Sequence, residues 1–402
     1  MNLIQTPSDL RSLVDILSKE NIIAFDTEFI RETTFFPQLE IIQVATASDA
    51  WIVDVQAFRK DVEGLKPFLD VLRDPGILKI LHAAQADQEC LFTAFGCIAS
   101  PTLDTAIAAS LCGYGDQQGL GNLLKSVLDV QLKKGHARTN WAVRPLPEQL
   151  VEYALDDVRY LVAMGQALIK ELDELKRRDW AMELTAKWED VAMYDPAPET
   201  LAAKIDGRAS LDPKEFSALI ELVRWREARV KQLNRPRKWI ADDGILLNLA
   251  QVSPRDMEHL KAFRGIQVGE IQKSGEAILD AIRSGKENPI PHPTSRRKAT
   301  PAEREMTRPP SARESQALSL LQCYIGILAD QHRVAVRHIV MSQQLLPLMR
   351  TSTVESAVEW MNQGLLSRWA GELIGQEILE FLRGEKALTL DRVKGVKVTQ
   401  AK

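Results

Sequence analysis

The segment Asp26-Thr27-Glu28 contains residue types that can hold a metal ion. It follows the apolar run Ile22–Phe25, which predicts a buried strand. Alternate residues of a strand point to the same face, so we expect the two carboxylates to project together. Two adjacent anions repel each other unless a cation holds them, and a divalent metal is the natural reason to place them there. The alternative is that these acids only begin a solvated loop.

Three residues further along the chain can join these acids. Asp87 opens a predicted helix. Tyr153 and Asp157 are four positions apart on another predicted helix, which puts a phenol and a carboxylate on one helix face. Taken alone, Asp87 is an acid favoured by the helix dipole, and Tyr153 is a half-buried core residue.

The elements around these residues predict an α/β domain over residues 1–175. Apolar runs at 22–25, 39–45 and 51–55 with short connections predict a three-stranded meander, and 78–82 predicts a fourth strand. A short helix is expected after Thr6, and one long helix from Pro147 to about Leu175. Strands first and helices after them favour an α/β architecture. Other helical patterns cover 62–72, 85–95, 104–111 and 120–128.

Helical patterns dominate the rest of the chain. A connector at 176–209 leads to a compact bundle at 210–285, with helices expected at 216–233, 243–250, 254–263 and 269–283. Residues 286–315 are rich in proline and poor in aliphatic residues, which predicts a flexible linker. Helical periodicity returns at 316–395 and predicts a third, smaller helical domain.

Three short motifs resemble those of a known enzyme family. Phe25–Phe29, His82–Asp87 and Tyr153–Asp157 closely resemble the three exonuclease motifs of the DEDD superfamily, in its tyrosine-containing branch. The segment Thr139–Leu146 is similar to one found in the ribonuclease D family, and residues 210–285 are similar to an HRDC domain. The last helical domain is only weakly similar to a second HRDC domain. One departure is Ala86, which stands where relatives often have an acidic residue.

The resemblance implies a fold and a mechanism. It implies an RNase H-like exonuclease domain with a mixed sheet, followed by all-α helical domains of HRDC type. It also implies two divalent ions, Mg²⁺ or Mn²⁺, bridged by Asp26, with Glu28 and Asp157 completing one site and Asp87 supporting the other through water. Tyr153 would orient the attacking water, and hydrolysis from 3′ to 5′ would release nucleoside 5′-monophosphates. Carboxylates suit Mg²⁺ because this ion prefers oxygen ligands and retains waters.

A second set of residues is expected to contact nucleic acid. Cations interleaved with aromatic residues favour a surface that follows an RNA backbone, although a solvated helix face is the alternative. The candidate RNA contacts are Phe29, Lys133, Lys134, His136, Arg138, Arg226, Arg229, Lys231, Arg237 and Lys238.

Composition and motif searches exclude several classes of protein. The charged fraction of 26% and the hydrophobic fraction of 45% are those of an ordinary globular protein, and no apolar run is long enough to span a membrane. The first residues do not have the pattern of a signal peptide, so we expect a cytoplasmic protein. The four cysteines lack metal-ligand spacing. No phosphate-loop motif is present, so no nucleoside triphosphate cofactor is expected.

These observations favour a cytoplasmic exoribonuclease that trims the 3′ ends of structured RNA such as tRNA precursors. The RNA substrate rests on the resemblance, because the five site residues do not separate RNA from DNA. One alternative is a DNA 3′-5′ exonuclease with the same site. Another is a non-catalytic RNA-binding scaffold on a decayed nuclease fold, which is disfavoured because all five positions are intact.

Overall fold

The amino-terminal unit is built on a mixed sheet. The computed structural model describes residues 2–132, 139–290, 306, 308–351, 353–392 and 395–401. Its 6-stranded sheet has the order β1-β4-β3-β2-β5-β6, in which β2, β3 and β4 form an antiparallel meander and the other pairings are parallel. The strands are β1 Leu3–Ile4, β2 Ile22–Ile30, β3 Gln38–Ala45, β4 Ala50–Asp54, β5 Leu78–Leu81 and β6 Thr102–Asp104. The predicted meander and fourth strand are confirmed. The two edge strands, of 2 and 3 residues, are too short to give a sequence pattern.

Helices cover both faces of the sheet, and β2 shows how the faces are separated. Ile23 and Phe25 join one core cluster, whereas Ala24 joins the other. The first cluster includes side chains of α1 (Pro7–Leu17), α2 (Lys66–Arg73) and α3 (Gln85–Phe95). The second cluster includes side chains of α4 (Thr105–Cys112), α5 (Leu120–Leu128), α6 (Glu148–Arg159) and α7 (Leu161–Glu174). Two 3-10 turns, η1 (Val55–Phe58) and η2 (Val62–Leu65), connect β4 to α2.

The long helix predicted over 147–175 is two helices. α6 ends and α7 begins at Tyr160, whose φ of −104° and ψ of −4° depart from helical values. α6 lies over β3 and β4, and α7 lies over β2 and β5, so the break lets each segment follow a different part of the twisted sheet. In α7, Gly165 allows close approach to β5, because a Cβ there would lie 2.9 Å from the Ile80 side chain.

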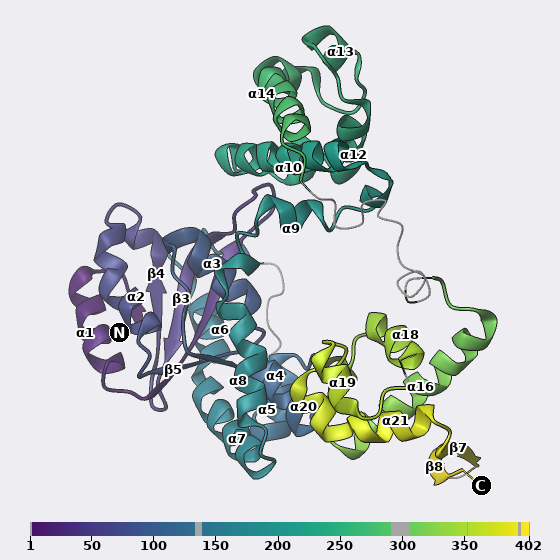
Figure 1. Cartoon of the computed structure of the whole chain (residues 1–402). Coiled ribbons are helices and arrows are strands. Elements are labelled where there is room, and N and C mark those ends of the chain that lie inside the picture. Colours follow the sequence, from purple (N-terminus) through teal and green to yellow (C-terminus); the bar gives the residue numbers. More distant parts are fainter. Residues whose placement is uncertain are drawn as a thin grey trace.

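A middle helical unit encloses its own core, whose buried residues lie between Ala202 and Ile282. Figure 1 shows α10 to α14 standing apart from the sheet, with α9 between them. The predicted helices of this bundle are all present. α10 starts with a capping box between Asp212 and Glu215 and ends at Asn234, which adopts a left-handed conformation with φ of 47°. The connector and bundle contain α8 Arg178–Ala186, η3 Lys187–Glu189, η4 Val191–Met193, α9 Pro198–Ala202, η5 Arg208–Ser210, α10 Pro213–Leu233, α11 Arg237–Ile240, α12 Asp243–Val252, α13 Met257–Ala262 and α14 Val268–Glu287.

The carboxyl-terminal helices share one core with the amino-terminal unit (Figure 1). Trp369 stacks on Trp180 with ring centroids 5.0 Å apart. The Arg177 guanidinium donates to the carbonyl oxygens of Leu111 and His332, each at 2.6 Å. The carboxyl-terminal segment therefore does not form a separate third core, because its buried residues belong to the core of the amino-terminal unit. Its elements are α16 Ala312–Gln331, α17 Val336–Ile339, α18 Ser342–Arg350, α19 Ala357–Asn362, α20 Arg368–Ala370, η6 Gly371–Gly375, α21 Gln376–Leu382 and the hairpin of β7 Lys386–Asp391 and β8 Gly395–Gln400, which the sequence did not predict.

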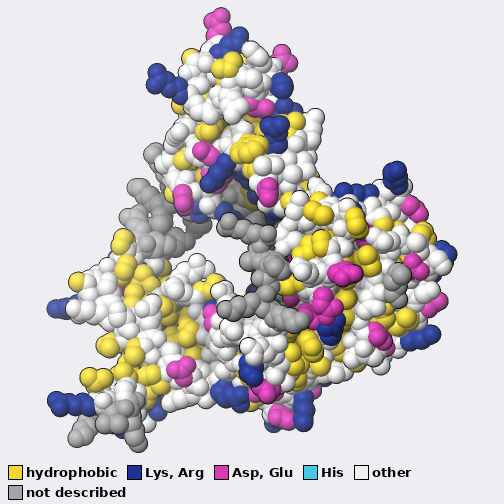
Figure 2. Space-filling view, turned by 180° about the vertical axis from the view of Figure 1, so that it is seen from behind, with side chains coloured by type: hydrophobic (Ala, Val, Ile, Leu, Met, Phe, Trp, Pro, Cys, Tyr) yellow, Lys and Arg dark blue, Asp and Glu magenta, His cyan; other side chains and the backbone are white. Residues whose placement is uncertain are grey.

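The surface and the expected linker add two observations. Among the described helices, none has both the length and the apolar character needed to cross a bilayer. On the face shown in Figure 2, Lys and Arg side chains are interspersed with Asp and Glu rather than gathered in one basic patch. Most of the expected linker, residues 291–305 and 307, lies outside the described residues.

Two helices of the middle unit, α10 and α14, approach each other closely at Gly285. A Cβ at Gly285 of α14 would lie 2.5 Å from backbone atoms of Ser217 and Ala218 in α10, and backbone cannot move aside as a flexible side chain can. We expect Gly285→Ala to destabilise the middle unit by about 1–3 kcal/mol, the usual cost of overpacking. Urea unfolding of the full chain, followed by far-ultraviolet circular dichroism, measures this loss.

Gly269→Ala is the matched control on the same helix. A Cβ at Gly269 meets nothing within 4 Å, so this change should leave stability unchanged or raise it slightly, because alanine favours the helix. Equal midpoints for Gly285→Ala and the unaltered chain would contradict the close packing of α10 and α14.

Candidate active site

Three carboxylates meet beside β2. Asp26 follows Ala24 on the face of the sheet that α6 and α7 cover, and Glu28 comes two residues later, next to a register shift between Glu28 and Phe29. Asp157 of α6 approaches them. One ligand oxygen from each of Asp26, Glu28 and Asp157 lies within 4.8 Å of the other two. The structure therefore brings together acids from sequence positions more than a hundred residues apart.

α6 supplies a phenol next to Asp157. The helix packs on the sheet through Ala154, Leu155 and Val158, and this places Tyr153 and Asp157 on one side of it. Their side chains form a hydrogen bond in which the phenol donates to the carboxylate. The neighbouring Asp156 takes no part in the cluster, because it forms an ion pair with Arg159 at 2.5 Å.

Asp87 approaches from the start of α3 but is not part of the three-carboxylate cluster. It is buried, and its Oδ1 accepts a hydrogen bond from Thr27 Oγ1 at 2.5 Å. Thr27 thus connects Asp87 to the strand between Asp26 and Glu28. The turn before α3 includes Ala83 with a φ of 59°, and Asp104 stabilises this turn by accepting the backbone N–H groups of Ala83 and Ala84 at 3.0 and 3.1 Å.

Trp141 contacts two of the site residues, and sequence reasoning did not assign it a role. Its indole N–H donates a hydrogen bond to the Glu28 carboxylate, and its ring lies 6.1 Å from the Tyr153 ring. Arg144 holds this segment by donating to the Trp141 carbonyl at 2.6 Å and to Asp54 at 2.7 Å. The signal for Trp141 in the sequence is its place in the segment 139–146, which is similar to one found in the ribonuclease D family.

Burial and mutual repulsion favour the protonated forms of these acids. Burial raises the pKa of Asp26 well above its usual range, and the charges of Asp87, Asp157 and Glu28 raise it further. Burial, followed by the charges of Asp157 and Asp87, raises the pKa of Glu28 to about 8. Burial also raises the pKa values of Asp87 and Asp157 to about 7. The pKa of Tyr153 is raised by burial and by Asp157, so the phenol keeps its proton at neutral pH.

This donor set fits a hard divalent cation. The clustered ligands are carboxylate oxygens, which Mg²⁺ and Mn²⁺ prefer, and the described group of potential metal ligands contains no histidine or cysteine. A cation would favour the ionised carboxylates and offset the repulsion that raises their pKa values. Divalent-metal dependence therefore follows from the chemistry of the cluster.

In the part of the chain that the structure describes, the expected RNA contacts are not brought together as one surface. Lys133, Lys134, His136 and Arg138 lie outside the described residues. Phe29 packs against the core cluster on the other side of the sheet from the acids.

The expectation for Arg226 is wrong. Its side chain is 3% exposed and donates to Asp243 at 2.6 Å and to Glu227 at 3.2 Å. A buried guanidinium with two carboxylate partners stabilises the fold of the middle unit and cannot contact an RNA phosphate from inside it.

The other expected cations of α10 and α11 have protein partners, except one. Arg229 pairs with Glu270 at 2.7 Å, and Lys231 pairs with Asp195 at 2.5 Å. Arg237 pairs with Glu227 at 2.6 Å. Lys238 is exposed, and no partner is seen for it in the described part of the chain.

Arg237 also joins the middle unit to the amino-terminal unit. Its guanidinium lies 5.0 Å from the Phe35 ring centroid. Close to this contact, Asn234 Oδ1 accepts the Phe36 backbone N–H at 2.9 Å. This part of the expected RNA surface is therefore a contact between units.

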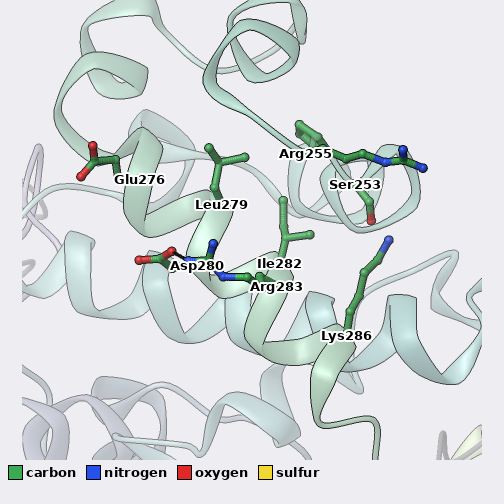
Figure 3. Close-up of a pocket in the computed structure, with 9 residues that line it drawn as sticks. Ser253, Arg255, Glu276, Leu279, Asp280, Ile282, Arg283 and Lys286 are labelled. Atoms are coloured by element: carbon green, nitrogen blue, oxygen red, sulfur yellow. Dashed lines mark hydrogen bonds and ion pairs between the residues drawn. The ribbon is translucent and has the colours of Figure 1, made fainter.

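A cavity of about 480 Å³ lies on the middle unit (Figure 3). Arg255 and Lys286 approach it from opposite sides near Ser253, while Arg283 forms an ion pair with Asp280. Glu276 adds a further acid, so the charges are mixed. None of its lining residues belongs to the five predicted catalytic positions.

Comparisons with known proteins agree with this geometry. The family model described as a 3′-5′ exonuclease matches residues 1–173, and the HRDC domain model matches residues 215–282. The chain is 32% identical to ribonuclease D of Gluconacetobacter diazotrophicus over 98% of this chain and 96% of that protein. It is 30% identical to ribonuclease D of Nitrobacter hamburgensis, with 100% of each chain covered.

A solved structure gives the same picture. The structure of Escherichia coli RNase D, described as an exoribonuclease involved in structured RNA processing, matches with a TM-score of 0.73 and 25% identity, covering 94% of this chain and 97% of that chain. The two family models match the structural units in order along the chain. The exonuclease model covers the mixed sheet, and the HRDC model covers the middle helical unit that follows it. The chain belongs to the ribonuclease D family.

Proposed function

We propose that this chain is a metal-dependent exoribonuclease that removes nucleotides from the 3′ end of RNA and releases nucleoside 5′-monophosphates. The observation that supports this most directly is the cluster of Asp26, Glu28 and Asp157, with Tyr153 bonded to Asp157. Its place in a family of 3′-5′ exonucleases supports the same reaction.

Two divalent ions, Mg²⁺ or Mn²⁺, are the proposed cofactors. Asp26, Glu28 and Asp157 would hold one ion, and Asp26 with Asp87 would hold the second. Such a pair supplies an activated water and stabilises both the attacking and the leaving oxygen of a phosphodiester displacement. The hydrogen bond from Thr27 uses one Asp87 oxygen, which agrees with Asp87 supporting the second ion through a water rather than binding it directly.

The protein's own groups would orient the reactants. The Tyr153 phenol keeps its proton at neutral pH, and by turning its hydroxyl away from Asp157 it can donate that single proton to the attacking water. Trp141 holds the Glu28 carboxylate with its indole N–H and limits movement of the Tyr153 ring. Trp141 is thus proposed as a positioning residue for both side chains.

The proposed substrates are structured RNAs with single-stranded 3′ extensions, such as tRNA precursors. The Escherichia coli relative, described as acting in structured RNA processing, supports this class. Lys133, Lys134, His136, Arg138 and Lys238 remain proposed phosphate contacts. Comparing ribo- and deoxyribo-oligonucleotides of one sequence tests RNA against DNA, and any metal-dependent cleavage rules out the non-catalytic scaffold.

The carboxylate cluster predicts that Asp157→Asn abolishes cleavage with little loss of RNA binding. Turnover should fall by about a thousandfold or more, because the change removes a metal ligand, whereas phosphate contacts elsewhere are retained. Single-turnover digestion of a 5′-labelled tRNA precursor with a 3′ extension, in Mg²⁺, measures the rate. Anisotropy of the same RNA measures binding.

Asp156→Asn is the matched control, because it changes the adjacent carboxylate, which pairs with Arg159 outside the cluster. Its rate should stay within a fewfold of that of the unaltered chain. Wild-type cleavage by Asp157→Asn would refute the metal assignment, and equal losses in both variants would indicate a disturbed helix instead.

The raised pKa of Glu28 predicts how stability depends on pH without metal. Between its ordinary value of 4.5 and about 8, the folded chain keeps a proton that the unfolded chain has released, so this group's contribution to stability falls as pH rises. Glu28→Gln lacks this titration. Its melting temperature relative to the unaltered chain should therefore increase from pH 5 to pH 8, on the order of several degrees, and level off above pH 8.

Thermal scans in EDTA and in Mg²⁺ at both pH values test this electrostatic account. Mg²⁺ should stabilise the unaltered chain more at pH 8 than at pH 5, because protons compete with the ion, and should stabilise Glu28→Gln less. A melting-temperature difference that does not change with pH would show that Glu28 titrates normally.

Tyr153→Phe tests the proposed role of the phenol. The change keeps the ring and its packing on Trp141 but deletes the hydroxyl, so we expect a rate loss on the order of a hundredfold with little change in melting temperature. Single-turnover rates and a thermal scan of the same preparation give both values. Full activity in the variant would make the tyrosine purely structural.

A further inference from the structure

A cavity of about 620 Å³ lies between the sheet and the carboxyl-terminal helices. Its walls come from the end of β5, the start of α4, the loop before α5, η3 and the region of α17. The function proposed above does not use it. The lining side chains with polar or charged groups include His82, Asp104, Gln118, Lys187, Arg337 and His338.

This cavity lies at the same edge of the sheet as the carboxylate cluster, and Gln85 of its lining is two residues before Asp87 on α3. β2 and β5 pair in parallel up to Ala24 and Ile80, and Asp26 and His82 each follow two residues later, so both lie at the same end of this strand pair. His82 lines the cavity, with its Nδ1 2.9 Å from Thr105 Oγ1. An RNA strand whose terminal phosphodiester lies at the carboxylates can therefore extend into the cavity.

The charge lining the cavity is positive. Lys187 and Arg337 are cations, and Asp104 is the only acid among the lining residues. The Asp104 carboxylate is 2% exposed and accepts three backbone N–H groups at 2.9 to 3.1 Å. These hydrogen bonds already use its oxygens, so Asp104 forms no ion pair with Lys187 or Arg337, although its charge still acts on Lys187.

Lys187 has no counterion among the described lining residues, and the counterion of Arg337 is Asp116, which does not line the cavity. Lys187 Nζ lies 4.3 Å from the Trp188 ring centroid, and no ion pair is seen for it in the described part of the chain. Burial and the charge of Arg337 lower the pKa of Lys187, and burial with both cations lowers the pKa of His338 to about 4. The buried indole N–H of Trp188 also finds no acceptor among the described residues. An anion here would relieve the repulsion between these cations.

Contacts between α17 and the amino-terminal unit fix the position of Arg337. Its Nε pairs with Asp116 Oδ1 at 2.7 Å. The adjacent His338 Nε2 lies 2.8 Å from Ser110 Oγ, and the Ala335 N–H donates to the Ser110 carbonyl at 3.0 Å. These bonds fix α17 against α4, so this wall of the cavity is built in advance of any ligand.

We propose that this cavity binds a phosphate group of the single-stranded 3′ segment of the RNA, on the 5′ side of the bond that is cleaved, with Lys187 and Arg337 as its cationic contacts. The inference rests on the proposed exoribonuclease function. It gives the carboxyl-terminal helices a direct part in binding substrate.

Binding of RNA to the full-length chain tests the proposal. Lys187→Gln and Arg337→Gln, each in the inactive Asp157→Asn background, are titrated with a fluorescent RNA hairpin that has a single-stranded 3′ extension. Each change should weaken binding severalfold and lower the slope of log affinity against log salt by about 0.7, the value for one phosphate contact on a single strand.

Single neutral linkages locate the contact. A methylphosphonate placed at one position near the 3′ end should weaken binding to the parent chain as much as Arg337→Gln does. The same methylphosphonate should not weaken binding to Arg337→Gln any further. The proposal would be overturned if the affinity losses from the methylphosphonate and from Arg337→Gln were additive at every position. An unchanged salt slope in both Lys187→Gln and Arg337→Gln would overturn it too.

Two control variants separate charge from docking. Arg333 belongs to the same segment, pairs with Glu171 at 2.5 Å and does not line the cavity. Arg333→Gln therefore removes a nearby cation, and the salt slope of this variant should be unchanged. Asp116→Asn removes the partner of Arg337 but keeps the cation, and binding should be retained or become tighter. Weaker binding in Asp116→Asn would mean that displacement of α17, rather than loss of a phosphate contact, explains the Arg337 result, and would count against the proposal.

A free nucleotide is the other source of the same anion. If adenosine 5′-monophosphate binds the parent chain more tightly than Arg337→Gln while the methylphosphonate RNAs bind both alike, the cavity takes free nucleotide and the proposal for RNA is wrong. Cleavage by the unaltered chain tests the proposed function separately. A chain that cleaves RNA, but whose Lys187 and Arg337 variants bind RNA unchanged, contradicts only the cavity.

Discussion

Repulsion among half-buried carboxylates is the constraint around which this molecule is arranged. Asp26, Glu28 and Asp157 meet within a few ångströms, and Asp87 approaches the same strand through Thr27. Without a cation, ionising them together costs free energy, so folding has to supply the energy that holds them close. That energy comes from the two cores that enclose β2 and from donors such as the Trp141 indole, which favour the charged form.

Local patterns predicted much of this structure, and contacts between distant residues account for what they missed. The meander, the helix carrying Asp87 and the bundle helices each have a periodicity that is visible within a short window. Trp141 has no such signal, because its role arises only when its segment, fixed by Arg144 to Asp54, lies against Glu28. The break at Tyr160 was missed because no glycine or proline marks it.

The expected RNA surface on α10 shows how counting charges along the sequence can mislead. Only one acid, Glu227, interrupts the run of cations, which favours a basic face. The acids that pair with Arg226, Arg229 and Lys231 come instead from other elements of the fold, namely Asp243, Glu270 and Asp195. The cavity shows the reverse case. Lys187 and Arg337 are far apart in the sequence, so no run of cations predicts them, and the fold brings them together.

The shared core of the amino-terminal unit and the carboxyl-terminal helices affects how the chain can fold during synthesis. Ser110 and His338 are 228 positions apart, and contacts of such separation are slow to close. The middle unit has its own core and can fold before them. Until the last helices leave the ribosome, the parts of α4 and α8 that they cover stay exposed, Trp180 among them. A nascent chain can thus contain every acid of the site and still lack the partner that completes its core.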